Sequence, residues 1–147
     1  EIETVAARVQ GVKPELPAFD NNAQVVLGLS NGRAGVINAS WSAHLPTSSR
    51  GVIGTRGTAL IRGDGFFDFV EHRIRTEEME FPRSTWLNDL FDAESYYTEN
   101  RHFADCILQE KRPDVTADNG VEALRVSLAI LESSRSGETV RIGGTSS

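Results

Sequence analysis

Trp41 and His44 form the first of two groups of side chains that are suited to binding a hydroxylated small molecule. They stand at the expected end of a strand, a place where side chains commonly line a cleft. An imidazole beside an indole can contact a polyol by hydrogen bonding and stacking. The competing interpretation is a histidine in a surface loop next to a tryptophan that packs in the core.

A second group of such side chains surrounds the start of an expected helix, where Tyr96, Tyr97 and Glu99 precede Arg101 and His102. Two aromatic rings with a carboxylate, a guanidinium and an imidazole can form one wall of a polar site. The same residues also fit a capped helix whose aromatic rings fasten it to a sheet. The candidate substrate-binding residues are therefore Trp41, His44, Tyr96, Tyr97 and His102.

The remaining reactive side chains predict no catalytic or metal-binding role. No pair of His, Cys or carboxylate residues has a recognisable metal-ligand spacing. Cys106 falls in an amphipathic segment and is expected to be a small buried residue and not a reactive thiol. His72 is expected to face solvent near a turn, and Lys13 and Lys111 are expected to be solvated charges.

The glycine pattern argues against a nucleotide site within this chain. A dinucleotide fold needs a glycine-rich turn between a strand and a helix, where the phosphates meet the helix N-terminus. The sequence has no such turn, no Walker-type phosphate loop and no GxSxG elbow. Its pairs Gly32 with Gly35 and Gly54 with Gly57 lie between expected strands, where tight turns and flat packing explain them.

Length and composition describe one ordinary domain. The 147 residues can build a core without metals or disulfides. The 21 acidic against 15 basic residues give a net charge of −6, which argues against nucleic acid as a partner. A single cysteine fits a reducing compartment, so the expected location is cytoplasmic. We expect neither a membrane span nor a signal peptide.

Alternating apolar residues predict the strands that must position these side chains. The first covers residues 2–9, and a hairpin joins 24–30 to 33–43 through a two-residue turn at Asn31-Gly32, so that Ser30 faces Arg33. In that register the core face carries Val25, Leu27, Leu29, Ala34 and Val36. The opposite face carries Gln24, Val26, Gly28, Gly35, Ile37, Ala39 and Trp41. We expect this second face, the Gly28 and Gly35 face, to meet a partner.

The rest of the chain predicts further strands and then helices. A second tight hairpin turns at residues 54–57, strands follow at 66–71 and 73–81 with the latter at an edge, and a short strand covers 139–142. One helix runs from about Thr98 to before Pro113, and another runs from an N-cap at Thr116 to Gly137. This order predicts an α+β domain over residues 1–143, with 144–147 as a tail. We expect a mostly antiparallel, mixed open sheet with the helices on one face and the other face available for oligomerisation.

Short motifs recur along the chain in a recognisable order. They are Asp20-Asn21-Asn22, Asn31-Gly32, Ala39-Ser40-Trp41, Ile53-Gly54-Thr55-Arg56-Gly57-Thr58, Glu99 with His102-Phe103-Ala104-Asp105-Cys106-Ile107, Arg112-Pro113, Asp118-Asn119-Gly120-Val121-Glu122-Ala123-Leu124, and Leu131-Glu132-Ser133-Ser134 with Gly137-Glu138-Thr139-Val140. Together they resemble the C-terminal domain of the Gfo/Idh/MocA oxidoreductases over about residues 2–142.

The resemblance implies a parent enzyme that passes hydride between NAD or NADP and a sugar, inositol or related alcohol. In that family an N-terminal Rossmann domain binds the cofactor, and the C-terminal domain helps bind substrate and oligomerises through its open sheet. The sequence starts at Glu1 and its only methionine is Met79, so we expect a piece of a longer protein. The family's catalytic segments precede that start. No catalytic or cofactor-binding residue is therefore assigned, and the chain alone is expected to be inactive.

The resemblance also bears on the candidate site. Family members often place substrate-contacting side chains at the positions that Trp41, His44 and Tyr96 occupy here, with Tyr97 and His102 adjacent. Trp41 and His44 depart from the tyrosines that some members use, so the substrate stays open. The alternative function is a stand-alone ligand-binding or interaction module that has the same fold and carries out no chemistry.

Overall fold

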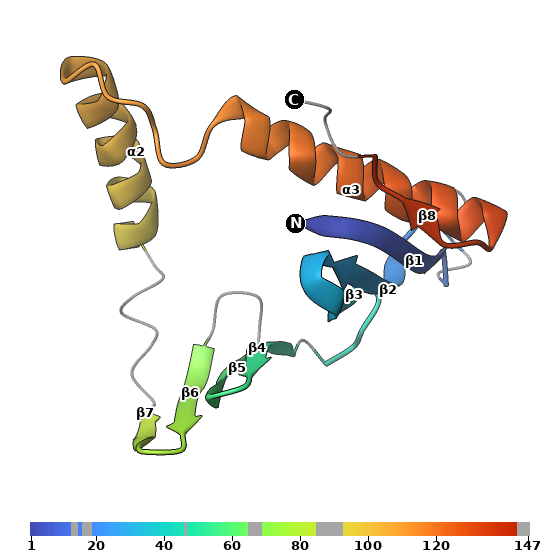
Figure 1. The fold of residues 1–147 in the computed structure, drawn as a ribbon, viewed down its shortest axis with the longest axis horizontal. Helices are drawn as coiled ribbons and strands as arrows, with labels where there is room; N and C mark the ends of the chain where they lie inside the picture. Colours follow the sequence, from blue (N-terminus) through green and yellow to red (C-terminus); the bar gives the residue numbers. More distant parts are fainter. Residues whose placement is uncertain (13–14, 16–18, 46, 65–68, 85–92, 144–147) are drawn as a thin grey trace. The chain divides into compact units, whose positions relative to one another are not determined.

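The computed structural model describes residues 1–12, 15, 19–45, 47–64, 69–84 and 93–143. The chain divides into two compact units. Unit 1 comprises Glu1–Ala43 and Asp114–Ser147, and unit 2 comprises His44–Pro113 (Figure 1). The predicted tail, residues 144–147, lies outside the described residues.

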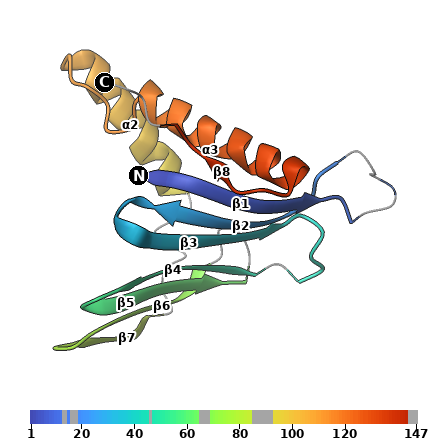
Figure 2. The same cartoon turned by 45° about the vertical axis from the view of Figure 1, so that its right-hand side comes forward.

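Unit 1 combines a four-stranded antiparallel sheet with one long helix. The sheet has the order β3-β2-β1-β8. Its strands are β1 (Ile2–Gln10), β2 (Asn22–Leu29), β3 (Arg33–Ser40) and β8 (Val140–Arg141). The helix α3 (Ala117–Ser136) runs alongside β1 and β8 (Figure 2).

The core of unit 1 lies between α3 and one face of this sheet. Val5, Val25, Leu27 and Ala129 are buried together there, and half-buried apolar side chains from the strands and the helix surround them. The predicted core positions Val25 and Leu27 are confirmed. Burial of one face follows from the period of two along β1 and β2, which turns alternate side chains toward the helix.

Local signals set both ends of α3, as predicted. At the start, the backbone N–H of Thr116 donates to Oδ1 of Asn119 across 2.8 Å. At the end, Gly137 adopts the left-handed conformation with φ of 76°, and its N–H donates to the carbonyl of Ser133. Glycine accepts this conformation without the steric cost that a Cβ would add.

Two serines of α3 complete the outer edge of β1. The short strand β8 pairs with β1 only at Thr4 and Val5. Beyond that point the N–H of Ala7 donates to Oγ of Ser133 (2.9 Å), and the N–H of Val9 donates to Oγ of Ser134 (2.8 Å). Ser134 also donates to the carbonyl of Val9. Hydroxyl groups of the helix thus satisfy backbone groups that a longer strand would otherwise pair.

The predicted register of the β2–β3 hairpin is wrong by one residue. Asn31 and Gly32 do have positive φ, but the loop contains three residues, Ser30–Gly32, and Leu29 pairs with Arg33. The N–H of Ser30 donates to the carbonyl of Glu1 on the β1 side, so it cannot also pair with Arg33. A shift of one residue moves every side chain of a strand to the other face.

This shift corrects the predicted faces of β3. Gly35 pairs with Leu27 and therefore lies on the core face, whereas Gly28 pairs with Ala34 on the open face, so the predicted Gly28 and Gly35 face does not exist. Ala34 and Val36 leave the predicted core, and Ile37 and Ala39 leave the predicted open face. The open face of unit 1 is defined here by its apolar residues Ala6, Val26, Ala34 and Val36.

Unit 2 contains a second four-stranded antiparallel sheet, in the order β4-β5-β6-β7. Its described strands are β4 (Ser48–Gly54), β5 (Gly57–Gly63), β6 (Phe69–Thr76) and β7 (Glu80–Ser84), and its described residues also form the helix α2 (Ala93–Leu108). The α+β class is confirmed, while the strands are hydrogen-bonded as two ladders of four where one sheet was expected.

The hairpin between β4 and β5 turns where the glycines predicted it. Gly54 pairs with Gly57, which leaves Thr55 and Arg56 as the turn. A Cβ built on Gly57 would lie 2.5 Å from the carbonyl oxygen of Arg75 on β6. Only glycine fits at this point, because real Cβ contacts are not that short.

The predicted break between β6 and its neighbour is displaced. The sequence predicted strands at 66–71 and 73–81 around a turn near His72, but β6 runs straight through His72 and the chain turns at Glu77–Met79. There the N–H of Thr76 donates to the carbonyl of Met79. His72 is therefore half-buried in mid-strand, contrary to the solvent position expected for it, and its Nδ1 is buried without a hydrogen-bond partner among the described residues.

Candidate functional site

Trp41 stands immediately after β3, which ends at Ser40, three residues before the predicted end at residue 43. Its N–H donates to the carbonyl of Asn21 at the start of β2 (2.8 Å), which fixes the backbone at the strand end. Its side chain is 85% exposed. An indole held at its backbone and open to solvent suits ligand contact, and the competing interpretation of a core tryptophan does not describe it.

A polar network around Asn21 holds this strand end, and the sequence did not reveal it. Asn21 is only 3% exposed. Its Oδ1 accepts hydrogen bonds from the N–H of Val12 (3.1 Å) and from Nδ2 of Asn22 (2.6 Å). Asn22 also donates to Oγ of Ser42 (2.7 Å), directly beyond Trp41. A buried amide with several partners makes the strand end rigid. The motif Asp20-Asn21-Asn22 was the available signal for it.

Ser40 shapes the turn that leads out of β3. Its Oγ accepts hydrogen bonds from the N–H groups of Ser42 (3.2 Å) and Ala43 (3.1 Å). This is the turn that a serine hydroxyl commonly stabilises with backbone groups ahead of it. His44 follows as the first residue of unit 2, and it is exposed. Trp41 and His44 thus belong to different units, three positions apart in the chain.

The other three candidate residues lie on α2, which begins five residues earlier than predicted. Tyr96 and Tyr97 are 65% and 64% exposed. Neighbouring positions on a helix project about 100° apart, so the two rings face different directions. One turn further along the helix, Nδ2 of Asn100 donates to the carbonyl of Tyr96.

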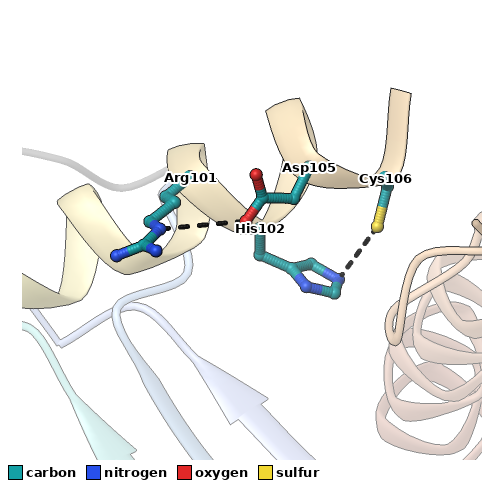
Figure 3. A network of polar contacts seen from close by, with 4 residues as sticks. All are labelled: Arg101, His102, Asp105 and Cys106. Atoms are coloured by element: carbon teal, nitrogen blue, oxygen red, sulfur yellow. Dashed lines mark hydrogen bonds and ion pairs between the residues drawn. The ribbon is translucent and has the colours of Figure 1, made fainter. Parts of the chain in front are cut away.

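His102 is turned along α2 toward the one cysteine of the chain. Its Nε2 lies 3.5 Å from Sγ of Cys106, one turn further along (Figure 3). On the adjacent side of the same turn, Nε of Arg101 lies 3.8 Å from Oδ2 of Asp105. Cys106 is 8% exposed, which confirms the small buried residue that the sequence predicted. One of the two ring nitrogens of His102, Nε2, is therefore directed toward the thiol of Cys106.

In the part of the chain that the structure describes, no group of three or more His, Cys, Asp or Glu side chains is placed to hold a metal ion. No helix of the described residues has the length and apolar character to cross a membrane.

Unit 1 is thus an antiparallel sheet packed under one long helix, with a polar strand end that presents an exposed indole. Residues 1–142 match the model of the C-terminal alpha/beta domain of the Gfo/Idh/MocA oxidoreductase family. The chain belongs to that family. The resemblance found in the sequence motifs is thereby confirmed.

Solved structures agree with this assignment. The chain is similar to an oxidoreductase from Agrobacterium radiobacter in complex with NAD+, L-tartaric acid and magnesium, with a TM-score of 0.78 and 20% identity over 97% of this chain and 44% of that one. It is similar to levoglucosan dehydrogenase in complex with NADH and L-sorbose, with a TM-score of 0.78 and 15% identity over 97% and 45%.

A putative myo-inositol dehydrogenase from Sinorhizobium meliloti 1021 is a third similar structure, with a TM-score of 0.72 and 18% identity over 97% of this chain and 44% of that one. At these identities the likeness establishes the fold alone. The chain spans less than half the length of each of these three structures. No curated protein matches the sequence.

Proposed function

We propose that this chain is the substrate-binding and oligomerisation domain of an oxidoreductase that transfers hydride between NAD or NADP and a sugar, inositol or related alcohol. The observation that carries the proposal is the family match over residues 1–142. Three similar structures carry names that include L-tartaric acid, L-sorbose or myo-inositol, all of which are hydroxylated compounds. Those names support the substrate class.

The cofactor belongs to another part of the parent protein in this proposal. The chain spans less than half of the similar structures, two of which hold NAD+ or NADH. An N-terminal Rossmann domain would bind the nucleotide and supply the catalytic groups. The 147-residue chain alone then has no oxidoreductase activity, and its cellular location is cytoplasmic.

Substrate contacts are proposed within each unit separately: at the end of β3 in unit 1, and at His44 and the first turns of α2 in unit 2. Trp41 offers an exposed ring for stacking on the apolar face of a sugar, and its backbone is already fixed by Asn21. His44 offers a donor and an acceptor. Tyr96 and Tyr97 add two exposed phenols, and His102 adds an imidazole beside them in the sequence. None of these five is proposed as a catalytic residue.

The open face of unit 1 is the proposed surface for self-association. Val26 is 52% exposed and Val36 is 76% exposed, and they are cross-strand partners on β2 and β3. Adjacent exposed valines with alanines beside them form an apolar patch of the kind that marks protein interfaces. This patch replaces the Gly28 and Gly35 face that the sequence suggested.

Calorimetric titration of NADH and NADPH into the 147-residue chain tests where the cofactor binds. We expect no specific heat for either nucleotide, while the longer parent protein binds one of them. Micromolar binding by the 147-residue chain would overturn the proposed division of labour. A gene that encodes no upstream strand-turn-helix segment with GxGxxG would instead favour the stand-alone binding module.

A further inference from the structure

The sheet of unit 2 carries a polar hollow of about 570 Å³, and none of the five proposed substrate-binding residues is among those that line it. It lies over the row Ser49, Arg62 and Glu71, which are consecutive cross-strand partners on β4, β5 and β6 and therefore share one face. Leu60 stands two residues before Arg62 on the same face and adds an apolar floor. The volume of the hollow falls within the range of binding sites for small molecules.

A buried carboxylate is the central feature of this hollow. Glu71 is 8% exposed, and its side chain is about nine-tenths buried. Nε of Arg73 lies 3.7 Å from its Oε1, so a positive charge compensates the negative one. An ionised carboxylate has about four acceptor positions, so Glu71 can accept hydrogen bonds from hydroxyl groups of a ligand alongside the partners it has within the chain. Hydrogen bonds to a charged acceptor are the stronger kind.

Hydroxyl groups line the rim on the β4 side. Thr47 and Ser48 precede Ser49 along the chain and also line the hollow, as does Asp64 just beyond β5. Each hydroxyl can both donate and accept a hydrogen bond. This set of groups is suited to a ligand that also carries many hydroxyls.

The balance of charge decides the class of ligand. Among the described residues, Arg62 and Arg73 offset Asp64 and Glu71, so these side chains favour neither an anion nor a cation by net charge. We propose that this hollow binds a neutral polyhydroxylated small molecule, a polyol or a monosaccharide. The site shares no residue with the proposed substrate site, so it goes beyond the proposed function.

Amide chemical shifts of the ¹⁵N-labelled 147-residue chain, titrated with myo-inositol, test this inference. We expect saturable shifts at Ser48, Ser49, Arg62 and Gly63. Magnesium chloride and sodium phosphate, titrated at matched ionic strength, should leave these amides unchanged. Shifts with either salt and none with myo-inositol would overturn the neutral ligand, and no shift with any of the three would overturn the site.

Two variants and one control assign the binding. Glu71→Gln keeps the shape of the side chain and removes its charge, so affinity should fall about tenfold or more. Ser49→Ala removes one hydroxyl and should weaken binding about threefold. Thr58→Ala removes an exposed hydroxyl from the same face of β5 outside the hollow and should bind like the unchanged chain. If the Glu71→Gln variant is unfolded, as loss of chemical-shift dispersion would show, the affinities of Ser49→Ala and Thr58→Ala for myo-inositol are compared instead. Equal affinities of these two variants would overturn the proposal.

The pattern of shifts also separates this inference from the proposed function. Shifts confined to Trp41–His44 and α2 would support the proposed substrate site and overturn the hollow. Shifts confined to the hollow would support the inference while the proposed substrate site fails.

Discussion

The N–H of Ala7 on β1 donates to the hydroxyl of Ser133 on α3 across 2.9 Å, between residues more than a hundred positions apart. Ser133 is 1% exposed and its own hydroxyl proton goes to the carbonyl of Glu138 (2.6 Å). One side chain therefore joins a strand edge, a helix and the segment that leads to β8. The edge of β1 depends on it as much as on β8 itself.

Replacing Ser133 with alanine should destabilise unit 1. The N–H of Ala7 and the carbonyl of Glu138 would each lose a partner, and an unsatisfied buried group costs about 1–3 kcal/mol. The midpoint of urea unfolding measures the loss. Ser127→Ala is the matched control, because Ser127 is an exposed residue of the same helix whose hydroxyl donates to the carbonyl of Ala123 in the preceding turn. Equal midpoints for the two variants would show that the Ser133 contacts contribute nothing.

Two glycine-to-alanine changes should move stability in opposite directions. Gly57→Ala places a Cβ 2.5 Å from the carbonyl oxygen of Arg75 and should cost about 1–3 kcal/mol, as overpacking does. Gly120→Ala meets nothing within 4 Å in the first turns of α3 and should gain about 0.5–1 kcal/mol. Thermal unfolding of both variants checks the signs. A stabilised Gly57→Ala variant would contradict the described β5–β6 contact.

Removal of the indole at position 41 should affect substrate use and leave the fold intact. Trp41 is 85% exposed, so Trp41→Ala should change the free energy of unfolding by less than about 0.5 kcal/mol. In the longer parent protein we expect kcat/KM to fall about tenfold, which corresponds to the loss of about 1.4 kcal/mol of contact. Cofactor affinity should stay the same. An unchanged kcat/KM in both Trp41→Ala and His44→Ala would remove this strand end from the substrate site.

A charge on the open face of unit 1 should prevent self-association. Val36→Lys places an ammonium group on the apolar patch, and the molar mass measured by light scattering should fall to that of the monomer. Val36 is 76% exposed, so the change should leave the fold stable. Val115→Lys is the control at an equally exposed valine, 77%, that lies outside the patch. If both variants keep the mass of the unchanged chain, the patch is not the interface.

Local chemistry explains which parts of the fold the sequence predicted. Thr116 and Gly137 mark the two ends of α3, and each makes its hydrogen bond with a residue only a few positions away. The residue types at these positions were therefore enough to predict where the helix begins and ends. The β2–β3 register was not predictable in this way. Asn31 and Gly32 suit a loop of two residues as well as one of three, and the carbonyl of Glu1 on the far side of β2 selects the longer loop.

In the candidate site too, features set by local sequence were predictable and features set by contacts between strands were not. The position of Trp41 at a strand end followed from the alternation along β3, which is a local pattern. The buried amide of Asn21 that holds it did not, because its partner Val12 reaches it only once β1 and β2 have paired. His72 shows the reverse error: its polar neighbours suggested a turn, but cross-strand pairing with Ile61 and Ser84 keeps it in mid-strand.

Unit 1 is discontinuous along the chain, since it contains residues on both sides of unit 2. During synthesis its first three strands emerge long before α3, while residues 44–113 are still to be translated. At roughly 5–20 residues per second that interval lasts several seconds, during which Val5, Val25 and Leu27 have no helix to cover them. The nascent chain therefore presents an uncovered apolar sheet to the cell, and chaperones that hold such surfaces have a defined window in which to act.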